Sequence, residues 1–385
     1  MKKNYGKSTK DILLEHSKAK VELYAKYLSK YLNIIKRAGY YNKIHLYDLM
    51  CGEGIYADNS KGSPIIALET IRNHYNFNNN SCLDMDIWFN DLGKSDVEKG
   101  RNKIDRVKEK CKNIFKPPNI NIKYSNQDFI TEILPVIEKN IKNPKKEKFL
   151  LFLDPYGYKD ITPQRLNRIL TNNAVELLLF VPITPMYRFA NKSLKEEDFK
   201  GGESLKAILI TLLNGEEKIF KNENDFIETL KEKYRSYLKH SFFVDTFTIE
   251  RNKSNTYALF FFTPHHKGFE TMLKTKWELD EKRGRGFKID TGQFELFENV
   301  EHFDYSDKLK SYIKNQNVTN KDLYIFGLNN GFLPTHSIEI LRDWQNRNKR
   351  FKVLENGNPV RKGAFYISSD YYSGKKKKLV SFIFE

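Results

Sequence analysis

Two kinds of hydrophobic pattern follow one another along the chain. Residues 8–37 carry apolar side chains at helical spacing and Gly39 follows them, so this segment is expected to form one long helix or two short ones. Short runs of consecutive apolar residues come next, and a helical stretch follows each of them. These runs are expected to be strands, at residues 44–49, 86–89, 120–124, 149–153 and 175–181.

The alternation of strand and helix predicts the fold class. Strand–helix pairs in succession are typical of an open parallel sheet with helices on both faces, and uninterrupted apolar strands agree because parallel strands are buried on both sides. Residues 242–249 and 257–262 then flank a polar turn, which predicts an antiparallel hairpin. We therefore expect an α/β fold with the mostly parallel, Rossmann-type sheet of class I methyltransferases, closed by an antiparallel hairpin.

The pattern changes beyond residue 300. Three short helical patterns are followed by strand-like residues at 351–354, 364–367 and 379–384. Three helices followed by a small β-wing match a winged helix-turn-helix. The expected parts of the chain are an N-terminal helical segment at 1–40, a methyltransferase-like α/β domain at 41–300 and a winged-helix-like domain at 301–385.

Composition narrows the class of protein. Apolar stretches such as 149–153 fall far short of the roughly 18–20 residues that a membrane span needs, and residues 1–20 contain no apolar signal segment. The three cysteines are too few for a disulfide framework, and no pair has the spacing of metal ligands. We therefore expect a soluble cytoplasmic protein with no membrane contact and no metal site.

The net charge of +17, from 66 Lys and Arg against 49 Asp and Glu, favours a polyanionic partner such as nucleic acid. A codon bias toward Lys, Asn and Ile is an alternative source of the excess. The charge is concentrated, however, since residues 1–40 carry ten basic residues against three acids, and residues 342–378 carry eleven against three. Charge at both ends favours contact with DNA or RNA.

A glycine loop follows the first predicted strand. Asp48 ends that strand, and Gly52 and Gly54 form a Gly-x-Gly turn, which lets a ligand approach the backbone without a Cβ in the way. In class I methyltransferases S-adenosylmethionine (SAM) lies across this loop, where an acid can hold its ammonium group. A tight turn with no ligand is the alternative.

Acids also follow the second and third predicted strands. Asp91 stands where class I methyltransferases bind the two ribose hydroxyls, because one carboxylate can accept two donors. Asp128 stands where an acid contacts the adenine amino group. Each acid alone is more often a helix N-cap, but successive strand ends converge on one crevice. The predicted cofactor-binding residues are Asp48, Gly52, Gly54, Asp91 and Asp128.

The fourth predicted strand ends in Asp154-Pro155-Tyr156-Gly157. Amino-methyltransferases acting on adenine or other exocyclic amines place Asp/Asn-Pro-Pro-Tyr/Phe here. The acid and a proline carbonyl accept hydrogen bonds from the amino group, which aims its lone pair at the methyl, while the aromatic ring stacks on the base. Asp154, Pro155 and Tyr156 are therefore the catalytic candidates, although Tyr156 replaces the second proline. A Pro-Gly turn that caps a buried strand is the alternative.

Four segments together resemble one bacterial family. They are Ser-Thr-Lys at 8–10, Tyr-Asp-Leu with Gly-x-Gly at 47–54, Gly-Ser-Pro-Ile-Ile-Ala-Leu at 62–68, and Asp-Pro-Tyr-Gly at 154–157. These segments are similar to those of the three-Cys-motif partner proteins (TcmP), a methyltransferase-like family, over most of residues 8–300. The resemblance implies a methyltransferase-like fold and a neighbouring protein with a Cys motif that looks like a radical-SAM enzyme. It supplies no substrate.

The chain departs from the TcmP loop pattern, Asp-Leu-Phe-Ala-Gly-Pro-Gly, at three positions. Met50 and Cys51 replace Phe-Ala, and Glu53 replaces Pro. Glu53 is therefore expected to put a negative charge beside the carboxylate of the cofactor.

Basic residues supply the candidate nucleic-acid contacts. Arg188 follows the fifth predicted strand and could meet a phosphate over the crevice, or form a surface salt bridge. In the C-terminal domain the second helix of the pair is expected at about 334–346, with Thr335, His336 and Ser337 at its start. Phosphate contacts are predicted for Arg342, Arg347, Lys349, Arg350, Arg361, Lys362, Lys375, Lys376, Lys377 and Lys378. A charged face on a protein-interaction module is the alternative.

Two functional hypotheses follow. The first is a SAM-dependent methyltransferase that acts on nucleic acid, at an amino group, by in-line methyl transfer. The second is a catalytically silent methyltransferase-fold module that binds nucleic acid and delivers it to a radical-SAM-like three-Cys-motif protein. The acids at three strand ends favour the enzyme, whereas Glu53 and the missing second proline favour the silent module.

Overall fold

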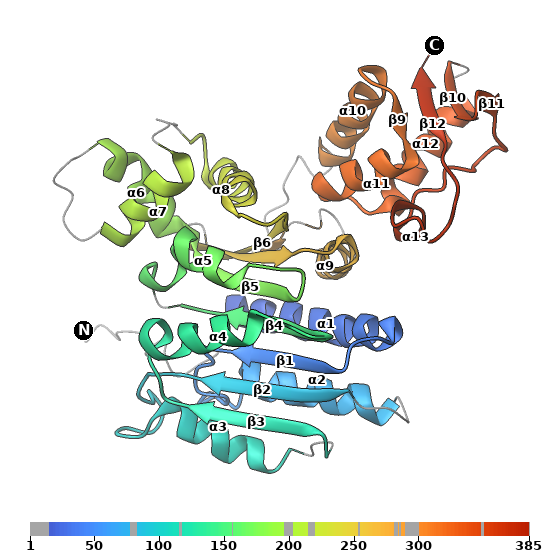
Figure 1. Ribbon diagram of the computed structural model, residues 1–385. Coiled ribbons are helices and arrows are strands. Elements are labelled where there is room, and N and C mark those ends of the chain that lie inside the picture. Colours follow the sequence, from blue (N-terminus) through green and yellow to red (C-terminus); the bar gives the residue numbers. More distant parts are fainter. Residues whose placement is uncertain are drawn as a thin grey trace. The chain divides into compact units, whose positions relative to one another are not determined.

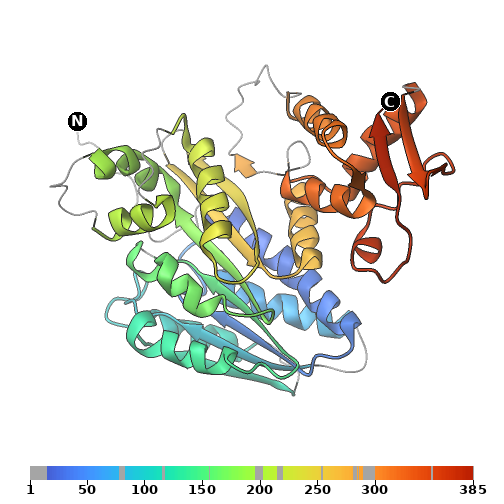
Figure 2. The same cartoon turned by 45° about the horizontal axis from the view of Figure 1, so that its top comes forward.

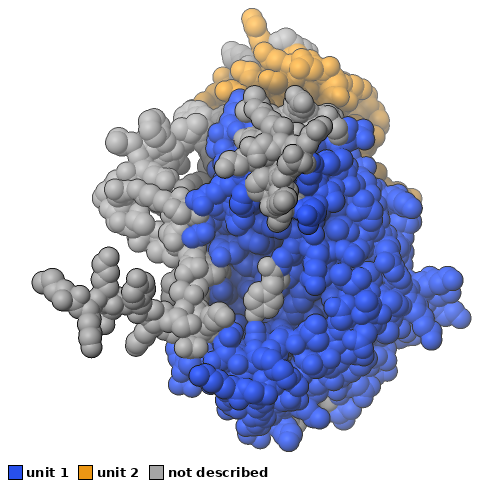
Figure 3. Space-filling model, turned by 90° about the vertical axis from the view of Figure 1, so that its left-hand side faces the viewer, with its two compact units in different colours: residues 1–265, 286–289 blue, residues 266–285, 290–385 orange. Residues whose placement is uncertain are grey.

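The computed structural model describes residues 15–77, 83–114, 118–155, 157–195, 203–214, 220–252, 255–280, 284, 286–288, 300–347 and 350–384. Two compact units divide the chain (Figure 3). Unit 1 comprises Met1–His265 with Gly286–Ile289, and unit 2 comprises His266–Arg285 with Asp290–Glu385. The contacts between residues therefore make unit 2 begin at His266. The hydrophobic pattern in the sequence, by contrast, changes only at about residue 300.

An eight-stranded sheet forms the centre of the described part of unit 1 (Figure 1). Its order is β3-β2-β1-β4-β5-β7-β6-β8. Neighbours among the first five strands in this order are parallel, and β7 is antiparallel to both β5 and β6. The strands are β1 (Lys43–Asp48), β2 (Asp84–Asn90), β3 (Ile120–Ser125), β4 (Glu147–Leu153), β5 (Val175–Pro182), β6 (Phe243–Asn252), β7 (Asn255–Thr263) and β8 (Gly286–Lys288). This topology confirms the predicted class I methyltransferase-like fold.

Helices cover both faces of this sheet (Figures 1 and 2). One face carries α1 (Glu15–Ala38), α2 (Ser63–Phe77) and α3 (Lys103–Lys112), which pack side by side. The other face carries η1 (Phe129–Ile133), α4 (Leu134–Ile141), η2 (Lys159–Ile161), α5 (Pro163–Ile169), α6 (Ile183–Lys195), α7 (Glu203–Leu213) and α8 (Glu223–Tyr237). The described part of the N-terminal helical pattern forms a single helix, α1, which belongs to unit 1, and residues 8–14 of the pattern lie outside the described residues.

The central strand β4 shows why the strands are apolar throughout. Phe149, Leu151 and Leu153 pack in the core beneath the α4–α8 face. Phe152 points to the opposite face and stacks on Tyr24 of α1, with 4.8 Å between ring centroids. Because helices cover both faces, an alternating polar pattern would bury polar side chains without partners.

Unit 2 contains a helical group and a small antiparallel sheet of order β11-β10-β12-β9. Its helices are α9 (His266–Leu279), α10 (Val300–Lys314), α11 (Asn320–Asn329), α12 (Pro334–Arg347) and α13 (Ser369–Tyr372). Its strands are β9 (Val318–Thr319), β10 (Phe351–Glu355), β11 (Asn358–Pro359) and β12 (Ser381–Phe384). No helix in the described ranges combines the length and the apolar character needed to cross a membrane.

One predicted strand of unit 2 is wrong. Residues 364–367 belong to no strand, and β10 pairs instead with β11 and β12. Tyr366 has a φ of +54°, in the left-handed region that interrupts a strand. Its carbonyl accepts a hydrogen bond from Asn320 Nδ2 at 2.9 Å rather than from a neighbouring strand.

Candidate functional site

The four acids predicted at strand ends all lie at the carboxyl edge of the sheet. Asp48 is the last residue of β1, Asp91 directly follows β2, Asp128 precedes η1 after β3, and Asp154 directly follows β4. These strands are parallel, so their carboxyl ends share one edge. The structure therefore places these acids along one edge, as the sequence predicts.

Asp48 is fully buried, and neither carboxylate oxygen forms a hydrogen bond of good geometry with a described residue, although the Ser63 hydroxyl lies close enough to act on its charge. The pKa of Asp48 is raised to about 7, mainly by burial and also by the charges of Asp154 and Asp91, while the Ser63 hydroxyl and the Lys20 ammonium oppose the shift. The hydroxyl of Tyr24 is also buried without a partner in the described part of the chain, and burial and the charge of Asp48 raise its pKa. Unpaired buried polar groups are rare and costly, which favours a ligand that supplies their partners.

The glycine loop is held in place by Asp91. Gly52 and Gly54 have φ values of +70° and +76°, in the region that glycine adopts at little cost. The Gly52 N–H donates to Asp91 Oδ2 at 2.9 Å, and the Gly93 N–H donates to Asp91 Oδ1 at 2.7 Å. Each carboxylate oxygen can accept a further hydrogen bond. Asp91 thus positions the loop, a role that the sequence does not predict, and retains acceptor capacity for a ligand.

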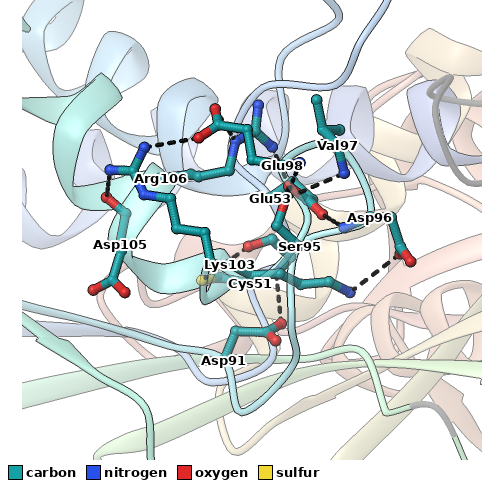
Figure 4. Close-up of polar contacts among 12 residues, drawn as sticks. Cys51, Glu53, Asp91, Ser95, Asp96, Val97, Glu98, Lys103, Asp105 and Arg106 are labelled. Carbon is teal, nitrogen blue, oxygen red and sulfur yellow. Dashed lines mark hydrogen bonds and ion pairs between the residues drawn. The ribbon is translucent and has the colours of Figure 1, made fainter.

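Glu53, in the glycine loop, is buried and engaged in an ion pair with Arg106 (Figure 4). Its carboxylate pairs with Arg106 of α3 and accepts hydrogen bonds from Ser95 Oγ at 2.9 Å and from the Asp96 N–H at 2.5 Å. Glu53 therefore ties the loop after β1 to the loop after β2. The expectation of a free negative charge beside the cofactor is wrong, because Arg106 neutralises it.

Substitution of Glu53 by alanine is expected to destabilise the protein by about 3–5 kcal/mol, because Arg106 would remain buried without its main counter-charge. Glu98 also bonds Arg106, at 2.9 Å, but is largely exposed. Glu98→Ala is therefore the matched control, with an expected loss below about 1 kcal/mol. Urea unfolding of both variants measures the difference, and equal losses would contradict a structural role specific to Glu53.

Asp128 is a helix N-cap. Its Oδ1 accepts hydrogen bonds from the Ile130 N–H, the Thr131 N–H and the Thr131 hydroxyl, at 2.9–3.0 Å. The backbone hydrogen bond from Thr131 is the main cause that lowers the pKa of Asp128. Its Oδ2 has no hydrogen-bond partner among the described residues. Oδ2 is therefore the oxygen left for the predicted contact with an adenine amino group.

Asp154 is paired with a residue that sequence analysis missed. Its Oδ2 forms an ion pair with the ammonium of Lys20, which reaches the carboxyl edge from α1. The Lys20 ammonium also lies 4.6 Å from the ring centroid of Phe180. Pro155 is buried, and Tyr156 lies outside the described residues. Of the predicted catalytic residues, the structure thus describes Asp154 and Pro155.

The strand order decides the fold of unit 1. It is methyltransferase-like. No protein-family model matches the chain. No curated protein matches its sequence.

Among the solved structures that match this chain are two at 13% sequence identity each. Protein LPL1258 from Legionella pneumophila str. Philadelphia 1, described under family model DUF519, matches over 67% of this chain and 90% of its own, with a TM-score of 0.37. Trm1 from Pyrococcus horikoshii, solved in complex with S-adenosyl-L-methionine, matches over 71% of this chain and 64% of its own, with a TM-score of 0.32. These likenesses are too weak to add to the argument from strand order.

The basic residues predicted to contact nucleic acid are exposed wherever the structure describes them, and Lys349 lies outside the described residues. Arg188 is exposed on α6 of unit 1. In unit 2, acids pair with three of these residues, Arg347 with Asp343, Lys376 with Asp370, and Lys378 with Glu355. The predicted basic residues of unit 2 that are exposed and form no ion pair with a described acid are Arg342, Arg361, Lys362, Lys375 and Lys377.

The start of α12 differs from its expected role. Ser337 is fully buried and shares a hydrogen bond of 2.6 Å with the hydroxyl of Tyr305. His336 accepts a hydrogen bond from the Leu333 N–H at 3.1 Å and packs 4.3 Å from Trp277, between ring centroids. These two side chains therefore stabilise unit 2, and Thr335 is the exposed one of the three.

Proposed function

We propose that this chain is a SAM-dependent methyltransferase that acts on an amino group of nucleic acid. The observation that carries the proposal is Asp48, a fully buried carboxylate beside the glycine loop that has no ion-pair partner and no well-formed hydrogen bond among the described residues. Asp91 and Asp154 add negative charge near it, against the single ammonium of Lys20. This excess of carboxylates suits a cationic ligand, and SAM carries both a sulfonium and an ammonium group.

The residues of the carboxyl edge divide into cofactor and acceptor groups. Asp48 would hold the ammonium of SAM, Gly52 and Gly54 would lie under its methionine part, Asp91 would accept from the ribose hydroxyls, and Asp128 Oδ2 would accept from the adenine amino group. When bound, SAM supplies an electrophilic methyl group.

Asp154 and the Pro155 carbonyl would accept hydrogen bonds from the acceptor amine and so orient its lone pair. The ion pair with Lys20 holds the Asp154 carboxylate in place at the end of β4. Asp154 Oδ1 has no hydrogen-bond partner among the described residues, so it is available to an incoming amine.

The acceptor class rests on charge and on unit 2. The order of its elements, with α11 and α12 as the helix pair and β10 and β12 as wing strands, supports a winged helix. The exposed basic residues on it support contact with phosphates, which is sequence-independent. The resemblance to TcmP adds a radical-SAM-like three-Cys-motif protein as a proposed partner.

The second hypothesis, a silent nucleic-acid-binding module, is favoured by the ion pair that engages Asp154 and by the missing second proline. Calorimetry with SAM and S-adenosylhomocysteine on the full chain separates the two hypotheses. Micromolar binding supports the methyltransferase. No binding at high micromolar ligand would leave only the silent module.

A fourfold Gln variant of Arg361, Lys362, Lys375 and Lys377 is expected to weaken nucleic-acid binding strongly and equally across sequences. These side chains are exposed and lack described acidic partners. The slope of log affinity against log salt should fall by about 0.7–0.9 for each lost phosphate contact. Fluorescence anisotropy between low and moderate salt measures both quantities.

The matched control places the same charge change on unit 1, with Gln at Lys108, Lys110, Lys139 and Lys142, which are exposed and form no ion pair with a described acid. It should lower the affinity much less and leave the salt slope nearly unchanged. Equal effects of the two variants would contradict a phosphate-binding face on unit 2.

A further inference from the structure

A cavity of about 560 Å³ lies at the amino edge of the sheet, opposite the glycine loop. It is formed in unit 1 by the segments that precede β1 and β5, by the first residues of β4 with those just before them, and by His265 after β7. Cavities of this volume accommodate small-molecule ligands. The chemistry of its lining comes mainly from Tyr40, Tyr41, Lys146, Lys148, Asn173 and His265.

Lys148 is a buried cation in this lining, only 3% exposed. Its ammonium donates to the Asn173 carbonyl, contacts His265 Nε2 at 2.7 Å and lies 5.1 Å from the ring centroid of Tyr41. An ammonium has three N–H donors, so these two polar contacts leave one unused. Lys148 forms no ion pair with any described residue, and burial lowers its pKa to about 8.

The nearest buried acid does not serve as a direct partner for Lys148. Both oxygens of Glu176 are engaged, one by the Tyr27 hydroxyl and the other by the Thr263 hydroxyl. Glu147, the one acid among the lining residues, lies 2.8 Å from His45 Nε2. The pocket therefore presents a buried ammonium that is influenced by Glu176 but forms no ion pair with a described acid, which suits an anionic ligand.

The rim adds a flat aromatic surface and a second cation. Tyr40 is 56% exposed, and its ring centroid lies 4.1 Å from that of Tyr41, to whose hydroxyl it donates. Lys146 is exposed and has a φ of +57°, and its carbonyl accepts a hydrogen bond from the Asn42 N–H at 2.8 Å. Lys146 thus has a left-handed backbone conformation, which costs energy for a lysine, at the edge of the pocket.

We propose that this pocket binds a nucleoside monophosphate, with its phosphate on Lys148, Lys146 and His265 and its base against Tyr40. The phosphate supplies the acceptor and the negative charge that the Lys148 ammonium lacks. The base stacks on the exposed tyrosine as nucleobases do on aromatic side chains. The site is separate from the carboxyl edge and does not depend on methyl transfer.

Calorimetry with AMP, inorganic phosphate and adenosine tests the proposal on the full chain, with S-adenosylhomocysteine present to occupy the carboxyl edge. AMP is expected to bind more tightly than either fragment, because it uses both halves of the site. Lys148→Gln should weaken AMP binding about 10- to 100-fold, the range of a charge-assisted hydrogen bond. Absence of AMP binding to the wild-type protein would overturn the proposal.

A second variant tests the proposal even if Lys148→Gln does not fold. Tyr40→Ala combined with Lys146→Asn changes two exposed side chains, and asparagine adopts a positive φ more readily than lysine. It should weaken AMP binding about tenfold or more. AMP affinity unchanged in this variant would place the nucleotide elsewhere, whatever the state of the SAM site, so this failure is distinct from failure of the methyltransferase proposal.

Proton uptake gives a further readout. At pH 8.5 AMP binding should take up protons, because the phosphate favours the charged form of Lys148, and Lys148→Gln should abolish that uptake. The other titratable groups around Lys148 are Glu176, Tyr41 and His265, and all of them remain in the variant. The enthalpy of binding in buffers of different ionisation enthalpy measures the uptake, and uptake that survives in Lys148→Gln would contradict the assignment.

Discussion

Asp154→Ala is expected to lower the rate of methyl transfer about 100-fold or more, while SAM affinity stays within about threefold. Asp154 follows β4, and its free oxygen is the acceptor proposed to orient the reacting amine. Loss of one preorganised electrostatic partner of a transition state costs about 10²–10³ in rate. Single-turnover transfer of labelled methyl from SAM to cellular DNA and RNA measures the rate, and calorimetry measures the affinity.

The control for Asp154→Ala is Asp160→Ala, which removes an equal charge from η2, close by in the chain, without breaking a described ion pair. It should leave the rate within about twofold. Because Asp154→Ala also deprives Lys20 of its partner, thermal unfolding of each variant separates lost stability from lost chemistry. Equal transfer rates for Asp154→Ala and the wild type would remove Asp154 from the mechanism and favour the silent module.

Asp48→Asn is expected to stabilise the ligand-free protein and to weaken SAM binding at the same time. Burial raises the pKa of Asp48 to about 7, well above that of an unfolded aspartate, so folding favours its protonated form. The stability that Asp48 contributes is therefore full below about pH 4, declines as the pH rises to about 7 and stays low above that. At pH 8 the free energy of unfolding of Asp48→Asn should exceed that of the wild type by about 2 kcal/mol.

The same carboxylate should make SAM binding pH-dependent. A cationic ligand favours ionised Asp48, so the SAM affinity of the wild type should rise as the pH increases toward 8, with release of a proton. Asp48→Asn should lose about tenfold or more in affinity at pH 8 and should lose this pH dependence. Urea unfolding at pH 4.5 and pH 8 and calorimetry across the same range measure both effects.

Asp105→Asn provides the control for these measurements, since Asp105 is an exposed acid on α3. It should change neither stability nor SAM affinity. A stabilised Asp48→Asn protein with unchanged SAM affinity would show that Asp48 is a buried charge without a role in binding the cofactor.

Local patterns in the sequence were sufficient to predict seven of the eight strands of the sheet, all but β8, and the position of its acids. Uninterrupted apolar runs such as Phe149–Leu153 indicate strands covered on both faces, because hydrophobic periodicity depends on near neighbours in the chain. Asp48, Asp91 and Asp154 follow such runs, and parallel strands bring their ends to one edge. The sequence also held a partial indication that Lys20 has a special role. Lys20 lies on the same helix face as Tyr24, Tyr27 and Tyr31, so it is a charged residue in an otherwise apolar stripe.

Only the tertiary structure decided which groups pair with one another. Glu53 meets Arg106, Asp154 meets Lys20, and α9 packs with unit 2 although it directly follows β7 of unit 1. The members of each ion pair stand 53 and 134 positions apart. Neither periodicity nor turn chemistry encodes such contacts, because they depend on which surfaces the fold brings together. The burial of each acid is also decided by the fold. Asp48 and Asp128 both stand at or after a strand end in the sequence, but the fold buries Asp48 without an ion-pair partner among the described residues and makes Asp128 a helix cap.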